Sequence, residues 1–229
     1  MRKLTLLLLA LAAASCPAAA ESDQKGAEII AAAKAATGGN AWDNIQIWHE
    51  TGHALLPSGE SPRYEHWADL HSLKTRNLSI GESGTQYTVF DGQAAYQSSN
   101  SSFRPRSELN GAMMKYGAYL ACFGFFFPQR FEASFHFKGT HTDHDASYDV
   151  VTVSPAGLDS VDVWVDQKTH RISRYVYANG RFQTVLSDYR HVGAVSVPFA
   201  SVDGGSRIQT DSIAFESADS AIFSVARQR

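Results

Sequence analysis

Cysteine and net positive charge are both scarce in this chain of 229 residues. Its cysteines are Cys16 and Cys122, too few for a disulfide framework or for a zinc module built on cysteine. The 20 Lys and Arg residues are outnumbered by 23 Asp and Glu residues, so no basic field is available to attract nucleic acid. The composition, 44% hydrophobic and 19% charged, excludes disordered, collagen-like and coiled-coil chains.

Long apolar runs are also missing. After the N-terminal segment, no apolar run reaches the roughly 20 residues of a membrane-spanning helix. The segment itself has the pattern of a secretory signal: a positively charged start, an apolar run at Leu4–Ala14 and small residues at Ala18–Ala20. We therefore expect residues 1–20 to be a signal peptide and residues 21–229 to form a single exported domain. Removal of the signal would leave that domain with a charge of about −5.

Cys16 leaves a second outcome open for the same segment. A cysteine after Ala13-Ala14-Ser15 would suit the lipidated first residue of a bacterial lipoprotein, although the Leu usual three positions before it is absent. If cleavage follows Ala20 instead, Cys122 is the one cysteine left, and we expect it to be a buried small hydrophobe.

The spacing of apolar residues predicts a helix followed by a long series of strands. Glu21–Thr37 places its isoleucines and two alanines on one side, and Gly38-Gly39 ends it. Apolar and polar residues then alternate, which is typical of strands with one apolar face, and turn pairs such as Asn179-Gly180 indicate antiparallel hairpins. About eleven strands are expected, near residues 45–55, 63–77, 85–90, 94–98, 133–138, 147–153, 161–166, 171–177, 182–189, 194–202 and 207–217.

One helical segment interrupts these strands. Leu109, Met113, Tyr116 and Leu120 recur at steps of three and four, and Ser107 is a suitable N-cap, so Ser107–Cys122 is predicted to be a helix. The order of elements predicts an α+β fold with a single large curved antiparallel sheet, an unclosed barrel of about eleven strands, whose concave face is covered by helices.

Several short motifs follow one another along nearly the whole mature chain. They are Trp42 after Gly38-Gly39, Phe90-Asp91-Gly92 with Tyr96, Trp164–Thr169, Ser187–Arg190, Val197-Pro198-Phe199 and Ala221-Ile222-Phe223. Their order resembles the superfamily of bacterial outer-membrane lipoprotein carriers and their periplasmic relatives, and most of all the carrier-like domains that precede periplasmic aspartyl proteases. The resemblance implies a periplasmic half-barrel with a helical lid. No Asp-Thr-Gly or Asp-Ser-Gly occurs in the chain, so it implies no catalysis.

An apolar pocket is the site that these residues favour. A curved sheet beneath a helix rich in Met and aromatic side chains encloses either a cavity for acyl chains or a packed core. We interpret the chain as a carrier or binding protein for a lipid, an acyl chain or a lipoprotein, with no cofactor, metal or nucleic acid. A structural or protein-binding envelope module with a filled barrel is an alternative. The expected ligand-binding residues are Met113, Met114, Tyr116, Tyr119, Leu120, Phe123, Phe125, Phe126 and Phe127.

The phenylalanines Phe123 and Phe125–Phe127 carry more aromatic surface than a connection between a helix and a strand usually does. We expect Ser107–Cys122 and this run to form a movable cover whose rings turn inward when the cavity is empty. The alternative is a fixed plug in the core.

His49-Glu50-Thr51-Gly52-His53 fits the zinc hydrolase pattern His-Glu-x-x-His. On a helix both imidazoles would reach one zinc ion, with Glu50 as general base. Gly52 weakens such a helix by about 1 kcal/mol relative to Ala. On a strand His49 and His53 would lie about 13 Å apart, at about 3.3 Å per residue, too far to share one metal. A zinc-dependent hydrolase is therefore kept only as the alternative function.

Overall fold

The computed structural model describes residues 17–82, 84–99, 102–105, 108–177, 180–217 and 220–224. Cys16, Ser107 and most of the expected signal peptide lie outside these ranges. The described helices are α1 (Pro17–Ala36), η1 (Gly39–Asn44), α2 (Glu108–Ala121), η2 (Gly124–Phe126) and η3 (Ser220–Phe223). The described strands are β1 (Ile47–Leu55), β2 (Arg63–Asp69), β3 (Thr75–Gly81), β4 (Gly84–Phe90), β5 (Ala95–Ser99), β6 (Ser102–Pro105), β7 (Ala133–Asp143), β8 (Ala146–Pro155), β9 (Val161–Asp166), β10 (Ile172–Tyr177), β11 (Phe182–Val192), β12 (Val195–Asp203) and β13 (Ser206–Glu216).

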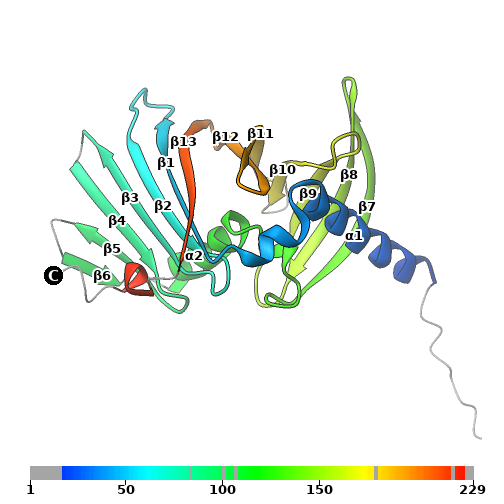
Figure 1. Cartoon of the computed structure of the whole chain (residues 1–229), viewed down its shortest axis with the longest axis horizontal. Coiled ribbons are helices and arrows are strands. Elements are labelled where there is room, and N and C mark those ends of the chain that lie inside the picture. The colour runs from blue at the N-terminus through cyan, green and yellow to red at the C-terminus, as the bar shows by residue number, and fades with distance from the viewer. Residues whose placement is uncertain are drawn as a thin grey trace, which may run out of the picture.

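All thirteen described strands join in one sheet, in the order β6-β5-β4-β3-β2-β1-β13-β12-β11-β10-β9-β8-β7. Neighbouring strands are antiparallel, and most are joined by hairpins. The pairing of β1 with β13, from Ile47 opposite Glu216 to Leu55 opposite Arg207, joins the two halves of the chain. The sheet is not closed, because β6 and β7 form its two edges (Figure 1).

The expected number of about eleven strands is wrong by two among the described residues. The stretch predicted as one strand at 63–77 is two strands, β2 and β3, joined by a turn. The Asp69 carboxylate accepts the backbone N–H of His71 at 2.8 Å, and Leu73 has a positive φ of 58°. Ala68 and Leu70 are buried before the turn and Leu73 and Thr75 after it, so each side alternates like a strand, although the step from Leu70 to Leu73 breaks the period of two. The second addition is β6, a strand of only four residues at the edge.

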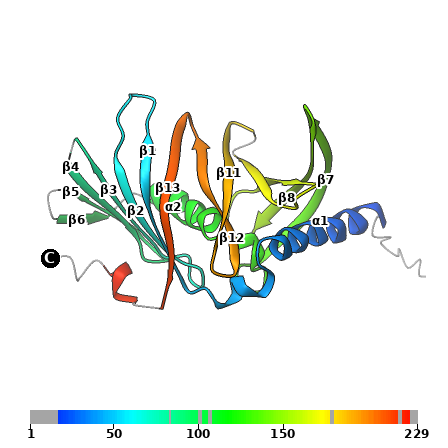
Figure 2. The same cartoon turned by 45° about the horizontal axis from the view of Figure 1, so that its top comes forward.

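The sheet curves into a trough with two arms, and α2 lies between them (Figures 1 and 2). Helix α1 packs along β7 and reaches β8 and β9. Gly26 permits this contact, because a Cβ at this position would stand 3.0 Å from the backbone nitrogen of Phe137. Ile30 and Ala33 of α1 are buried in the core together with Val151 of β8. The single-sheet architecture predicted from the sequence is therefore present, with α1 on one arm.

Aromatic rings form the centre of the core, where α2 ends. Phe125 and Phe127 are fully buried, and Phe126 is nearly so. The Phe126 ring lies 5.6 Å from that of Trp42, and the Phe125 ring lies 5.9 Å from that of Tyr175, measured between centroids. The aromatic run after α2 thus packs against both η1 and strand β10.

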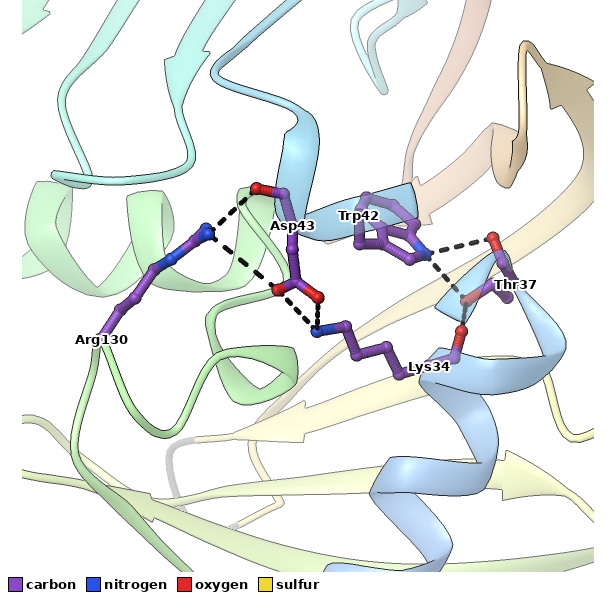
Figure 3. A network of polar contacts seen from close by, with 5 residues as sticks. All are labelled: Lys34, Thr37, Trp42, Asp43 and Arg130. Carbon is purple, nitrogen blue, oxygen red and sulfur yellow. Dashed lines mark hydrogen bonds and ion pairs between the residues drawn. The ribbon is translucent and has the colours of Figure 1, made fainter. Parts of the chain in front are cut away.

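A polar network fixes the same region from outside (Figure 3). Lys34 Nζ lies 2.8 Å and 3.0 Å from the two carboxylate oxygens of Asp43, and Arg130 donates to the Asp43 carbonyl at 3.1 Å. Trp42 Nε1 donates to the Thr37 carbonyl at 3.1 Å. Through these contacts α1, η1 and the segment before β7 hold one another in place.

Two further expectations concern membranes and thiols. No helix in the described part of the chain is long and apolar enough to cross a bilayer. Cys122 is free and fully buried, and its Sγ donates to the Asp69 carbonyl at 3.7 Å. Burial raises the pKa of this thiol, with a smaller effect from Asp69. The interpretation of Cys122 as a buried small hydrophobe is confirmed.

Candidate functional site

A cavity of about 500 Å³ lies between α2 and the middle strands of the sheet. We call it the α2 cavity. Its wall combines residues of α2 with residues of β1, β2, β10, β11 and β12, so it spans both halves of the sheet. The lining residues are Trp48, Glu50, His66, Met113, Tyr116, Gly117, Leu120, Ala121, Phe123, Asp159, Tyr175, Tyr177, Phe182, Thr184, Leu186, Pro198 and Asp203.

Helix α2 forms one wall because its apolar residues recur at helical spacing. Met113, Tyr116 and Leu120 lie on one face and line the cavity together with Gly117. A Cβ at Gly117 would meet no atom within 4 Å, so this position leaves open space beside the helix. The glycine therefore widens the cavity at the middle of α2.

The end of α2 is shaped by two residues with special backbone requirements. Phe123 adopts the left-handed conformation, with φ 50° and ψ 45°, and its side chain reaches the cavity. Gly124 follows, where a Cβ would stand 2.3 Å from the Tyr119 ring. This tight turn sends Phe125 into the core while Phe123 stays on the cavity wall.

The opposite wall consists of side chains from the sheet. Trp48 on β1, Tyr175 on β10 and Leu186 on β11 are apolar or aromatic and buried or partly buried. Phe182 lies at the start of β11 and is 48% exposed, and its ring stacks on Tyr177 at 5.8 Å. Phe182 therefore places an aromatic ring where the cavity meets solvent.

A polar group lies at the β1–β2 side of the cavity. Glu50 and His66 are cross-strand partners, and both line the cavity. The indole Nε1 of Trp48 donates to Glu50 at 2.9 Å. His66 Nδ1 lies 2.5 Å from the side-chain oxygen of Asn77, while His66 Nε2 is buried without a hydrogen-bond partner among the described residues.

A second polar group lies on the other side, where the Tyr177 hydroxyl donates to Asp203 at 3.1 Å. Burial raises the pKa of Tyr177, and the negative charge of Asp203 adds to that increase. Asp159, in the connection between β8 and β9, contributes a third carboxylate to the lining. The lining is thus mostly apolar, and its charged side chains are all acidic.

Two tyrosine hydroxyls add hydrogen-bonding capacity that the described protein does not use. The hydroxyl oxygens of Tyr116 and Tyr175 are buried, and no described residue bonds to them. Burial raises the pKa of both phenols, and Tyr177 and Asp159 contribute further for Tyr116. Both side chains therefore stay neutral near pH 7 and keep a hydroxyl proton that no described residue accepts.

The structure brings four of the nine expected ligand-binding residues to the cavity: Met113, Tyr116, Leu120 and Phe123. Met114 is partly buried against the core instead. Four others, Tyr119 and Phe125–Phe127, are buried in the core outside the cavity lining. The rings of this run do turn inward, but whether they move and whether any of the nine contacts a ligand stays a prediction.

Sequence reasoning missed the half of the site that the sheet provides. Glu50 and His66 pair across β1 and β2, whereas Asp203 lies far along the sequence on β12, and the pairing of β1 with β13 brings it into the same concave surface. The usable signal was the alternation in each strand, which marks the inward residues but not which strands are neighbours.

The His-Glu-x-x-His residues lie on strand β1 and do not converge. His49 pairs with Glu216 at 2.6 Å, whereas His53 lies 3.5 Å from Asp211. Glu50 points to the opposite face, into the α2 cavity. Among the described residues no group of three or more His, Cys, Asp or Glu side chains is placed to hold a metal ion.

No protein-family model and no curated protein matches the sequence. The chain shares the fold of a DUF1329 family protein. The crystal structure of that protein, from Desulfovibrio piger, matches with a TM-score of 0.61 at 11% identity and covers 91% of this chain and 99% of the other. At this identity the likeness shows the fold alone.

Two weaker matches lie below the range that supports a comparison. An uncharacterized conserved protein from Thermus thermophilus has a TM-score of 0.36 at 9% identity, with 87% of this chain and 93% of the other covered. The Pseudomonas aeruginosa MucA/MucB complex has a TM-score of 0.25 at 11% identity, with 85% and 58% covered.

Proposed function

We propose that this chain is an exported binding or carrier protein of the cell envelope, which holds a lipid, an acyl chain or the lipid part of a lipoprotein in the α2 cavity and catalyses no reaction. The α2 cavity carries this proposal. Its volume of about 500 Å³ lies within the range of about 300–1,000 Å³ typical of small-molecule sites, and its lining is mostly aromatic and aliphatic.

The proposal includes the processing and location of the chain. Residues 1–20 are removed as a signal peptide, residues 21–229 form one domain, and the mature protein resides in the bacterial periplasm. Lipidation at Cys16 is the alternative, which would anchor the same domain to the outer membrane. The resemblance to lipoprotein carriers supports this location, whereas the further kinship with domains that precede aspartyl proteases carries no part of the proposal.

Helix α2 is the proposed cover of the cavity. Only its face with Met113, Tyr116 and Leu120, continued by Phe123, borders the cavity, and Met113 is 66% exposed. A ligand can therefore reach the cavity past the N-terminal half of α2 without disturbing the aromatic core at its C-terminal end. Phe125–Phe127 act as the fixed plug that holds this end of the helix in place.

The two alternatives receive less support. A module with a filled barrel does not need the space beside Gly117 or the unused hydroxyls of Tyr116 and Tyr175. A zinc hydrolase needs both imidazoles of His49 and His53 on one ion, and the two histidines pair with different carboxylates.

Purification from the native envelope tests the proposal. Solvent extraction of the purified protein, followed by mass spectrometry, should yield an acyl-containing molecule in an amount comparable to that of the protein. Extraction of the Gly117→Leu variant, in which the added side chain occupies the cavity, should yield much less. Protein that carries no acyl molecule, and that binds no dodecanol in vitro, would refute the proposal.

A further inference from the structure

The charged residues that line the α2 cavity are all acidic. They are Glu50, Asp159 and Asp203, and no lysine or arginine is among the lining residues that the structure describes. A fatty acid or a phospholipid that brought an anionic group into this space would meet three carboxylates and no counter-charge. Both the repulsion and the loss of hydration would weaken its binding.

The β1–β2 side of the cavity offers hydrogen-bond acceptors to a ligand. Because an amide oxygen can only accept, the contact of Asn77 Oδ1 with His66 Nδ1 places the imidazole proton on Nδ1. In the neutral imidazole the buried Nε2 of His66 is then an acceptor that no described residue satisfies. The carboxylate of Glu50 stands on the neighbouring strand, directly across from His66.

Glu50 is oriented before any ligand arrives. The indole N–H of Trp48 holds its carboxylate at 2.9 Å, and the Tyr64 hydroxyl also bonds to Glu50. Burial raises the pKa of Tyr64, and the negative charge of Glu50 adds to that increase. Asp203 likewise accepts a hydroxyl proton, from Tyr177, and Asp159 is exposed. Glu50 is therefore the lining carboxylate that has an unsatisfied acceptor, His66 Nε2, on the neighbouring strand.

We propose that the α2 cavity selects an amphiphile whose alkyl chain lies along α2 and whose ammonium head group donates to Glu50 and His66 on β1 and β2. This assignment rests on the proposed binding function and adds the charge of the head group to it. Met113, Tyr116 and Leu120 line the path of the chain, and Trp48, which belongs to the aromatic core, lines the cavity beside Glu50. Carboxylate-headed amphiphiles of the same length bind more weakly, because no cation in the lining meets them.

Three probes of equal chain length test the charge preference. Dodecylamine, dodecanol and dodecanoate are titrated into the full-length mature protein by calorimetry, below the concentration at which each forms micelles. We expect dodecylamine to bind about ten-fold or more tightly than dodecanol, as one charge-assisted hydrogen bond provides, and dodecanoate to bind more weakly than dodecanol. If dodecanoate binds as tightly as dodecylamine, or more tightly, the inference is overturned and the proposed function stays intact.

Two matched glutamate variants locate the head group. Glu50→Gln removes the charge inside the cavity and should reduce the ratio of dodecylamine to dodecanol affinity by about ten-fold. Glu65→Gln is the control, because Glu65 is on the same strand as His66 but on the other face, where it lies 4.0 Å from His49. This variant should keep the wild-type ratio.

Three other results would contradict the position of the head group, the charge preference or the binding function. If Asp203→Asn lowers the ratio of dodecylamine to dodecanol affinity and Glu50→Gln leaves it unchanged, the head group does not lie at β1 and β2. Failure of all three probes to bind would overturn the proposed function and the inference together. If the wild-type protein binds dodecanol and dodecylamine with equal affinity, the inference is overturned and the proposed function stands.

Discussion

Truncation of Phe127 should destabilise the protein strongly. The Phe127 ring is fully buried, and two cations lie over it, with Lys34 Nζ at 4.8 Å from the ring centroid and the Arg130 guanidinium carbon at 4.6 Å. A buried Phe→Ala change costs about 3–5 kcal/mol once the cavity that it leaves is included. Loss of the two cation–π contacts adds about 0.5–1 kcal/mol each. We therefore expect the free energy of unfolding to fall by at least about 4 kcal/mol.

Urea-induced unfolding, followed by intrinsic fluorescence, measures this change as a shift of the midpoint at constant slope. Phe182→Ala is the matched control, because Phe182 is 48% exposed, and its truncation should cost about 1 kcal/mol or less. If Phe127→Ala cannot be purified, Phe127→Leu should still lower the midpoint measurably. A loss below about 1 kcal/mol in Phe127→Ala would show that Phe127 is not a core plug and would restore the movable-cover interpretation.

Three further changes have expected outcomes. Asp43→Ala removes the carboxylate that Lys34 and Arg130 share, while Arg130 keeps its bond to the backbone carbonyl, and the change should cost about 1–3 kcal/mol in urea unfolding. The exposed Asp145→Ala should change little. Gly124→Ala should be destabilising by thermal denaturation, because its Cβ would stand 2.3 Å from the Tyr119 ring, and a neutral result would contradict the packing. Burial raises the pKa of Tyr116, Tyr119, Tyr175 and Tyr189 above the usual value of about 10. The contribution of these neutral phenols to the free energy of unfolding is therefore fully present below about pH 10 and is lost as the pH rises above it, so the phenolate absorbance of these four residues should increase only as the protein unfolds. Titration of all phenols near their usual pKa in the folded protein would refute the burial.

The local elements were largely predictable from the sequence because their signals are local. The helix expected at 21–37 is α1, Pro17–Ala36, and the strands on either side of the predicted turn at residues 179–180 are β10 and β11, paired from Tyr177 opposite Phe182. The segment 63–77 was predicted wrongly because Leu70 and Leu73 are buried inside a turn. The segments on either side of the turn alternate separately, and the three-residue step from Leu70 to Leu73 is the sign of the turn that was overlooked.

The site was predictable only on its helical side. Met113, Tyr116 and Leu120 share a helix face, and helical spacing reveals that without tertiary information. Glu50 and Asp203 are brought to the same cavity by the order of strands in the sheet, which alternation does not encode. The Phe125–Phe127 run was assigned to the ligand because an aromatic run looks the same in a cover and in a core plug.

Two glycines of α2 allow a direct test of whether the α2 cavity is the binding site. A Cβ at Gly111 or at Gly117 would meet no atom within 4 Å, and only Gly117 lines the cavity. Replacement of either by Leu should stabilise the helix by a similar amount, about 0.5–1 kcal/mol, so the two variants differ chiefly in where the side chain lies.

Calorimetric titration of dodecanol into the wild-type protein, Gly117→Leu and Gly111→Leu measures the difference. We predict saturable binding of about one dodecanol per wild-type chain, the same affinity within about two-fold in Gly111→Leu, and a loss of at least about ten-fold in Gly117→Leu. Equal affinity in all three proteins, or no binding by the wild-type protein, would contradict the assignment of the α2 cavity as a ligand-binding site.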